Sequence, residues 1–186
     1  MEIENRIIDY EANKEEIKKW VLLKGEQKYL QFIEILEKKG IPCTWKNVDD
    51  LCRYDKRILI NVFKYMSLFE DTIRAVAWNN LEIEYKTLED DLIWKTIERL
   101  VEVGNIDKTF INIEYIISNK TNINKLRRMI SHNKLMLLGE GKEPGLKELI
   151  EIFKEALPTA YQEGYVRDIN ACVKGLNLDD KMAIKL

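Results

Sequence analysis

Apolar residues recur every three or four positions along most of the chain, which is the spacing of an amphipathic α-helix. The clearest series runs from residue 47 or 54 to residue 78, and its apolar face is continuous: Ile58, Leu59, Val62, Phe63, Met66, Phe69, Ile73, Val76 and Ala77. A second series extends from about Lys14 to Lys39, with a kink allowed at Gly25 and a stop at Gly40 and Pro42. We expect these two long helices to pack antiparallel as the main hairpin.

The remaining sequence predicts several shorter helices. Their expected ranges are Asp90–Val103, Thr121 or Asn122 to about Gly139, Leu146–Leu157 and Thr159–Lys174. A glycine follows the first range and a proline separates the last two, and both are typical helix stops. The segment 106–117 fits the alternation of a strand and the spacing of a helix equally well, and we interpret it as a helix. The sequence therefore predicts an all-α helical bundle formed as a single domain, residues 1–186.

Composition limits the class of protein without indicating a function. The chain has 186 residues, a hydrophobic content of 46% and a formal net charge of -2, with charges of both signs well mixed. No apolar signal core opens the chain and no stretch approaches membrane-spanning length, so we expect a cytoplasmic protein with no membrane partner. The three cysteines lack metal-ligand spacing and only one histidine accompanies them. We therefore expect no metal and no cofactor.

The only histidine, His132, lies in a cationic segment of this acidic protein. Between Tyr115 and Gly139 there is no aspartate or glutamate, and five cations surround the histidine: Lys120, Lys125, Arg127, Arg128 and Lys134. A local cationic site in a molecule of net negative charge favours an anion, and a phosphate is the anion we expect.

The segment from Leu126 to Asn133, with the sequence LRRMISHN, resembles the signature of the HEPN superfamily of small all-helical domains. In that superfamily an arginine precedes a histidine by a short spacer, usually in a pattern like Leu-Arg-Asn-x-x-Ala-His. Leu126, Arg127 and His132 match in type and spacing, and a serine occupies the small position before the histidine. Arg128 departs from the pattern, since the family usually has Asn or another small polar residue there.

A narrower resemblance is to Abi-like phage-defence proteins within that superfamily. In these proteins an earlier helix carries a glutamate and an arginine four residues apart, as Glu70 and Arg74 do here. The resemblance implies a HEPN-like helical bundle and a metal-independent endoribonuclease of a bacterial defence or toxin system. It also implies RNA or a nucleotide as the ligand, a homodimer, and an antitoxin or other defence protein as a further partner.

Cleavage of RNA through its own 2′-hydroxyl has requirements that these residue types can meet. The reaction needs a base at that hydroxyl, an acid at the leaving 5′-oxygen, and positive charge around a phosphate that gains negative charge. Histidine suits either proton-transfer role near neutral pH, and arginine binds two phosphate oxygens at once. One histidine per chain fits this need for two proton-transfer groups poorly, and a twofold homodimer would supply a second His132 and a second Arg127.

Helix geometry leaves two candidates for the arginine that works with His132. On a straight helix, residues four apart differ by ~40° and residues five apart by ~140°, so Arg128 shares a face with the histidine and Arg127 does not. The resemblance nevertheless assigns catalysis to Arg127 and His132. Other residues are expected to bind the phosphate or the RNA, or to support the site: Arg128, Asn133, Lys125 and Lys134 for binding, and Glu70 and Arg74 for support.

Two further interpretations remain open at this point. In one, the protein is a non-catalytic HEPN-like module that binds a nucleotide or a protein, or that dimerises, through the same cationic surface. Arg128 and the low isoelectric point, about 5.7, favour that module. In the other, Arg127, Arg128 and His132 are structural and anchor their helix to neighbouring carbonyls and carboxylates.

Overall fold

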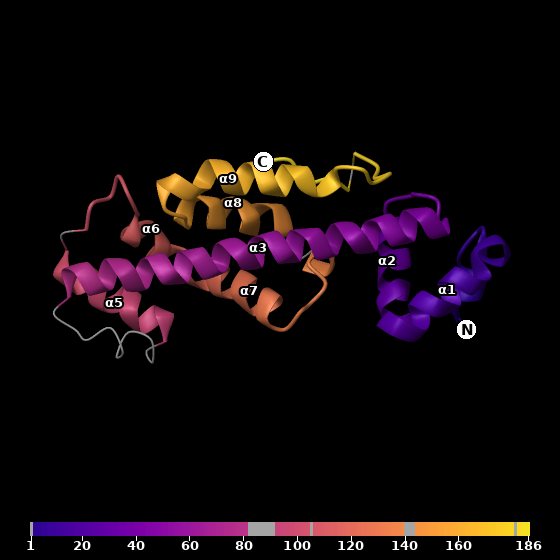
Figure 1. Cartoon of the computed structure of the whole chain (residues 1–186), viewed down its shortest axis with the longest axis horizontal. Coiled ribbons are helices and arrows are strands. Elements are labelled where there is room, and N and C mark those ends of the chain that lie inside the picture. Colours follow the sequence, from indigo (N-terminus) through magenta and orange to yellow (C-terminus); the bar gives the residue numbers. More distant parts are fainter. Residues whose placement is uncertain (1, 82–91, 105, 140–143, 181) are drawn as a thin grey trace. The chain divides into compact units, whose positions relative to one another are not determined.

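The computed structural model describes residues 2–81, 92–104, 106–139, 144–180 and 182–186 (Figure 1). Within these ranges every regular element is a helix, so the prediction of an all-α helical bundle is confirmed. The chain divides into two compact units: unit 1 consists of Met1–Ile58 and Ala171–Lys185, and unit 2 consists of Leu59–Asn170 with Leu186. One continuous helix contributes residues to both, and the single domain expected for residues 1–186 stays a prediction.

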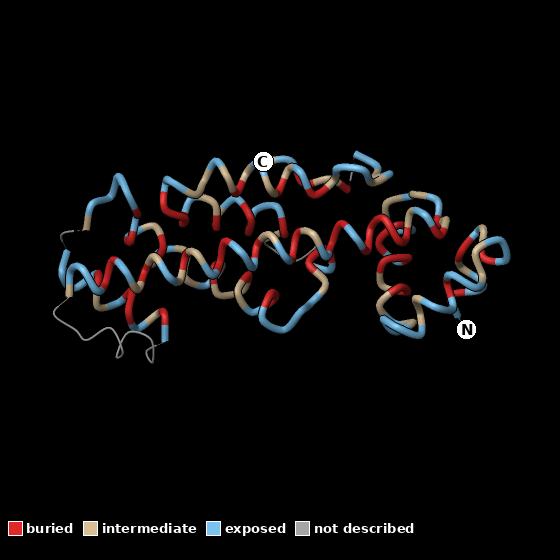
Figure 2. Tube along the Cα trace, viewed as in Figure 1, coloured by how far each residue is buried: buried red, intermediate tan, exposed pale blue. Residues whose placement is uncertain are grey.

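That continuous helix is α3, Trp45–Asn80, with 36 residues. It begins earlier than the apolar pattern indicates because side chains bind the amide groups of its first turn. The Asn47 amide donates to Thr44 Oγ1 at 3.3 Å, and the Trp45 amide donates to Asp9 Oδ1 at 2.7 Å. Buried positions recur along α3 in Figure 2 at the spacing that the sequence predicts. Phe63 is an exception, since it was expected on the buried face and is 59% exposed.

Unit 1 contains a 3-10 turn, Glu2–Asn5, and the helices α1, Tyr10–Lys24, and α2, Glu26–Lys38, besides the start of α3. The expected single helix over Lys14–Lys39 is therefore two helices. Gly25 separates them with a φ of 86°, a left-handed conformation that no helix interior accepts and that glycine adopts readily. The long hairpin that we expected with residues 54–78 consequently lacks a continuous first arm. The unit closes around buried apolar side chains: Ile17, Tyr29, Phe32, Ile33 and Trp45.

The segment after α9 folds back onto the first turns of α3 within unit 1. Arg57 Nη1 donates to the carbonyl oxygens of Cys172 at 3.0 Å and Lys174 at 2.8 Å. Farther along, the Ile184 amide donates to Tyr54 Oη at 2.7 Å in a buried hydrogen bond. These long-range bonds, with the burial of Ile184, make this segment part of the core of unit 1.

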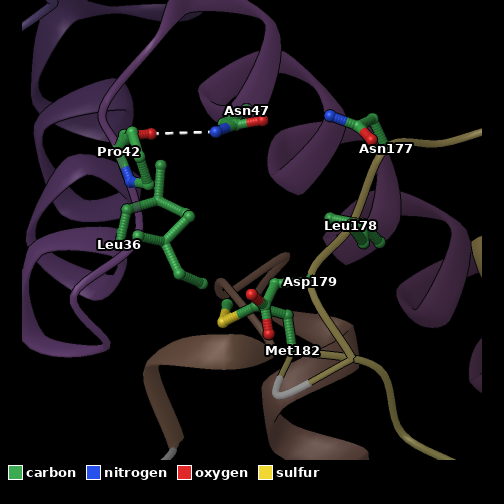
Figure 3. A pocket seen from close by; sticks show the side chains of 8 residues that line it. Leu36, Pro42, Asn47, Asn177, Leu178, Asp179 and Met182 are labelled. Atoms are coloured by element: carbon green, nitrogen blue, oxygen red, sulfur yellow. Dashed lines mark hydrogen bonds between the residues drawn. The ribbon is translucent and has the colours of Figure 1, made fainter.

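A cavity of about 240 Å³ lies between the end of α2 and this returning segment. Figure 3 shows the side chains around it, with the Asn47 side-chain amide donating to the Pro42 carbonyl at 2.9 Å. The cavity is lined by apolar and neutral polar groups with one carboxylate: Leu36, Ile41, Pro42, Asn47, Asn177, Leu178, Asp179 and Met182.

Unit 2 surrounds the second part of α3 with shorter elements: α5, Ile93–Val103; α6, Ile113–Ser118; α7, Lys120–Ser131; a 3-10 turn, Leu137–Gly139; α8, Leu146–Ala156; and α9, Thr159–Asn170. Aromatic rings link α3, α8 and α9, because the ring of Phe153 lies 5.8 Å from that of Phe69 and 5.7 Å from that of Tyr165. At the edge of this cluster, Lys64 and Tyr65 both donate to Asp168, and the bond from Lys64 lowers the pKa of that carboxyl group.

Three helix boundaries in unit 2 differ from the predicted ones. Only Ile113–Ser118 of the ambiguous segment is helical, because the Asn112 side chain accepts the Tyr115 amide at 3.0 Å and so begins the helix there. Helix α7 ends at Ser131, well before Gly139, and α9 ends at Asn170 rather than Lys174, followed by the 3-10 turn Ala171–Val173. The stop at Gly104, with a φ of 69°, is confirmed, whereas Asp90 lies outside the described residues.

The described residues hold no membrane-spanning helix and no exposed thiol. No helix among them is long and apolar enough to cross a bilayer. Cys43, Cys52 and Cys172 are free thiols and all are buried, as small apolar side chains would be. Burial raises the pKa of the Cys43 and Cys52 thiols, which keeps them protonated and unreactive at neutral pH.

The buried bond between Tyr54 and Ile184 leads to a stability prediction. Tyr54→Phe removes the acceptor and leaves the Ile184 amide without a partner, so the free energy of unfolding should fall by about 1 to 3 kcal/mol. Urea denaturation measures this loss, and hydrogen exchange should show reduced protection at the Ile184 amide. Tyr161→Phe, at a half-buried phenol, is the control and should change stability by less than about 0.5 kcal/mol. Equal effects of the two substitutions would contradict the prediction.

Candidate functional site

An ion pair joins α7 to α3 beside the segment that the sequence singles out. Arg127 Nε donates to Glu70 Oε1 at 2.6 Å. The other carboxylate oxygen of Glu70 lies 3.6 Å from Arg74 Nη2, so one carboxylate lies between two guanidinium groups. The Glu70 and Arg74 side chains are only 18% and 20% exposed, whereas Arg127 is 39% exposed. Glu70, Arg74 and Arg127 together carry a net charge of +1. The bond from Glu70 holds the Arg127 guanidinium in a defined position.

Packing of α7 explains why Arg127 meets α3 at this point. Its buried residues follow helical spacing and fix the orientation of the helix: Ile123, Leu126, Met129 and Ile130. Arg127 lies at the border of this buried face and reaches Glu70, while Arg128, the next residue, lies in the exposed part of the helix surface. The two neighbouring arginines therefore have different environments, one held by a carboxylate and the other in solvent.

The end of α7 has the geometry of a Schellman motif, in which two amides after the helix bind carbonyls of its last turn. The Asn133 amide donates to the Ile130 carbonyl and the Lys134 amide to the Met129 carbonyl, each at 2.9 Å. Asn133 has a φ of 48°, the left-handed conformation that this motif requires and that asparagine tolerates better than most residues. His132 is thus the C-terminal capping residue of α7. We had expected it inside a longer helix that continues to about Gly139, and that expectation is wrong.

His132 itself is exposed, and its ring forms no hydrogen bond with any residue that the structure describes. Arg128 and Lys134 are exposed as well. The exposed ring leaves His132 able to contact a ligand, whereas the ion pair of Arg127 with Glu70 is the carboxylate anchor that the structural interpretation expects. His132 has a φ of -93° and its amide still donates to the Arg128 carbonyl at 3.2 Å, so the helical angles still apply and place Arg128, rather than Arg127, on the face of His132.

The other cations of the segment bind structural partners. Lys120 Nζ lies 2.8 Å from Glu98 of α5, and Lys125 Nζ donates to the Pro144 carbonyl at 3.0 Å. The segment is free of acids along the sequence, but folding brings Glu70 and Glu98 to it from other helices. Of its five cations, Arg128 and Lys134 are the two that are exposed and bind no carboxylate among the described residues.

Sequence reasoning missed an exposed apolar pair on α3, Ile60 and Phe63, which are 54% and 59% exposed. Phe63 precedes Glu70 by seven residues, so the two lie ~20° apart on the surface of α3. Figure 1 shows α7 running antiparallel to α3, and the pair therefore lies toward the end of α7 that carries His132. The only signal in the sequence was the position of Ile60 outside the apolar stripe.

Comparisons with known proteins give no further assignment: no family model matches the chain, and no curated protein or solved structure matches it either. Within the described residues, no group of three or more histidine, cysteine, aspartate or glutamate side chains is arranged to hold a metal ion.

The contact between Glu70 and Arg127 predicts measurable coupling between the two residues. In a double-mutant cycle, Glu70→Ala and Arg127→Ala should show a coupling free energy of about 1 kcal/mol or more, because the carboxylate is largely buried and also binds Arg74. Urea denaturation of the four proteins measures it. The exposed pair Lys147 and Glu151, 3.7 Å apart on α8, is the control and should couple by less than about 0.5 kcal/mol. Independent effects of the two substitutions at Glu70 and Arg127 would show that the contact does not form in solution.

Proposed function

We propose that the protein is a metal-independent endoribonuclease of HEPN type, part of a bacterial defence or toxin system in the cytoplasm. The observation that carries this proposal is that Glu70 holds Arg127 near the end of α7 where His132 is exposed. A fixed guanidinium, five residues before an exposed imidazole, supplies the two kinds of group that phosphate chemistry without a metal requires. The resemblance of the LRRMISHN segment to the HEPN signature supports the same function.

In the proposed reaction, the 2′-hydroxyl of one nucleotide attacks the adjacent phosphorus. One His132 removes the proton of that hydroxyl while a new oxygen–phosphorus bond forms. The bond to the 5′-oxygen breaks, and a second His132, from a second copy of the chain, donates a proton to this leaving oxygen. The products are a 2′,3′-cyclic phosphate and a 5′-hydroxyl end. One oxygen–phosphorus bond forms while another breaks, so the reaction needs neither an oxidant nor a metal ion.

The arginines would stabilise the negative charge that develops on the phosphate. Glu70 engages only Nε of Arg127, so its two terminal nitrogens are oriented and remain for phosphate oxygens. Arg128 and Lys134, both exposed, are the proposed contacts to the flanking RNA backbone. Lys125 is a weaker contact, because its ammonium group would have to leave the Pro144 carbonyl.

Asn133 has a proposed role that differs from direct RNA binding. Its left-handed backbone forms the Schellman motif and sets the direction in which the chain leaves α7. The residue therefore positions His132 and Lys134 on either side of it, and its contribution to RNA binding would be indirect.

The second candidate is a non-catalytic module that binds a nucleotide, an antitoxin or another defence protein. It is favoured by the sharing of one carboxylate between Arg127 and Arg74, which reduces the positive charge available to a phosphate. Arg128, where the family pattern has a small polar residue, favours it too. In this case the exposed residues at the end of α7 would bind without proton transfer.

Substitution of the three key residues separates the two candidates. With purified protein, total RNA and EDTA, His132→Ala should lower cleavage by on the order of 100-fold or more and retain most RNA affinity, because the cations remain. Arg127→Ala should lower both the rate and the affinity. Arg128→Asn should leave activity intact or raise it if Arg127 is the catalytic arginine, whereas loss of activity would show that Arg128 has that role instead. Electrophoresis measures the rate, and chemical analysis of the fragments should find 2′,3′-cyclic phosphate ends.

The controls for this experiment address folding and contamination. Because His132 is exposed, His132→Ala should keep the melting temperature of the wild type in circular dichroism. Cleavage that is equal in all variants and abolished by EDTA would identify a contaminating metal-dependent nuclease. RNA binding without cleavage by the wild type would support the non-catalytic module.

The requirement for two histidines predicts a homodimer with its twofold axis near residues 121–138. The exposed apolar pair Ile60 and Phe63 would contribute contact area beside that axis. Sedimentation velocity should show a dimer, and Phe63→Ser should shift it toward monomer with a parallel loss of cleavage. Phe110→Ser, at another exposed phenylalanine of unit 2, is the control and should leave the dimer intact. A strict monomer at micromolar concentrations would contradict the catalytic proposal.

A further inference from the structure

The end of α1 carries two adjacent leucines that are strongly exposed. Leu22 is 87% exposed and Leu23 is 65% exposed, and neither Trp20 nor Val21 before them is fully buried. The chain turns back immediately afterwards at Gly25, so these residues lie at the corner between α1 and α2. Figure 2 shows this corner as a largely exposed stretch. Leaving two adjacent leucines in water is unfavourable, and such patches mark surfaces that bind another molecule.

Lysines surround the apolar corner. Lys18, Lys19 and Lys24 lie on α1, and the Lys24 ammonium is 4.4 Å from the centre of the Trp20 ring. Lys28 follows one turn into α2, and its charge and that of Lys24 both act on buried Cys52. An array of lysines around exposed leucines and a tryptophan favours a partner with an apolar interior and an anionic surface.

The acidic groups near the corner do not cancel this charge. Glu26 accepts the Ile3 amide, and Asp49 is paired with Arg53. Glu15 and Glu16 lie two to four residues before Lys18 and Lys19 on α1 and offset part of their charge, whereas no acidic residue of α1 lies within one turn of Lys24. From residue 17 to residue 28 there are four lysines and one glutamate, which is a local excess of positive charge in an acidic protein.

We propose that this corner docks on an anionic lipid surface, with Leu22 and Leu23 inserted below the headgroups and the lysines at the lipid phosphates. The two leucines are adjacent and therefore point ~100° apart around the helix. A protein groove binds a helix through residues three or four apart on one face, whereas lipid chains can surround side chains that point in both directions. Trp20 lies two and three residues before these leucines, and tryptophan favours the membrane interface. Each lysine near an anionic leaflet adds to the attraction.

The same features disfavour the other partners. In a symmetric contact between two copies, the lysines of one corner would face the lysines of the other and repel them. For RNA, the exposed groups would have to be aromatic to stack on bases, and leucine side chains cannot do so. Peripheral docking needs no spanning helix, so it departs from our expectation that the protein has no membrane partner. It is independent of the proposed ribonuclease.

Vesicle binding tests the docking proposal with the whole chain. The probes are large vesicles of phosphatidylcholine alone and of phosphatidylcholine with about 30% phosphatidylglycerol, and co-sedimentation gives the partition coefficient. The wild type should bind the anionic vesicles and bind the neutral ones weakly. The double variant Leu22→Ser and Leu23→Ser should lower anionic binding by at least about 10-fold. The triple variant Lys18→Gln, Lys19→Gln and Lys24→Gln should lower it by on the order of 100-fold.

A matched control distinguishes the corner from general apolar exposure. Ile8 is 72% exposed, also in unit 1, and Ile8→Ser should leave vesicle binding unchanged. The wild type failing to bind anionic vesicles, or binding as strongly after the leucine substitutions, would overturn the proposal. If the leucine substitutions instead convert a dimer to a monomer in sedimentation, the corner binds a second copy and the proposal is likewise overturned. His132→Ala should bind vesicles like the wild type.

Discussion

The burial of one face of α3 is the constraint on which both units depend. Its first turns supply Val48, Leu51 and Tyr54 to unit 1, and its later turns supply Phe69 and other fully buried residues to unit 2. Each large apolar side chain buried in this way contributes roughly 1.5 to 3 kcal/mol. Since a helix of ~54 Å exposes its apolar face along its whole length, the shorter helices of each unit exist largely to cover it. Glu70 is fixed by the same packing.

The candidate site combines one side chain of low mobility with others that are free to move. Glu70 and Arg74 hold Arg127 between two helices, whereas His132 extends into solvent from the turn that ends α7. A fixed guanidinium loses little conformational freedom when a phosphate binds. An exposed imidazole loses more, so in the proposed reaction a second copy of the chain or the RNA itself would have to restrict it.

Helical periodicity predicted the all-α class and most of the helices, because burial of one face dominates the sequence pattern. It could not predict features that depend on single backbone conformations or on side chains from distant segments. The sequence allowed a kink at Gly25 but did not predict a full break there, and it did not predict the end of α7 at His132. Both follow from left-handed residues, Gly25 and Asn133, and asparagine also occurs inside helices. Asp9, 36 residues before Trp45, accepts the first amide of α3, so the helix starts before both of the starts that the pattern allowed, residues 47 and 54.

The candidate site was predictable as a set of residues and less so as an arrangement. The short motif located Arg127 and His132, and the spacing of Glu70 and Arg74 indicated a supporting pair. The sequence did not predict that Glu98 of α5 would pair with Lys120, or that Arg127 would be the cation paired with Glu70. Phe63 was assigned to the buried face because periodicity shows which residues share a face of the helix. It does not show whether a neighbouring helix is long enough to cover that face at Phe63.

The polarity of α7 has a consequence for any anion bound beside His132. Many phosphate sites lie at the N-terminus of a helix, where unpaired amides carry partial positive charge. His132 lies at the opposite end, where the carbonyl dipoles carry partial negative charge and where the Schellman motif uses the Asn133 and Lys134 amides internally. The backbone therefore repels a phosphate here, and arginine and lysine side chains must supply the entire attraction. Binding at such a surface is screened by dissolved ions, so its strength would follow the ionic strength of the medium.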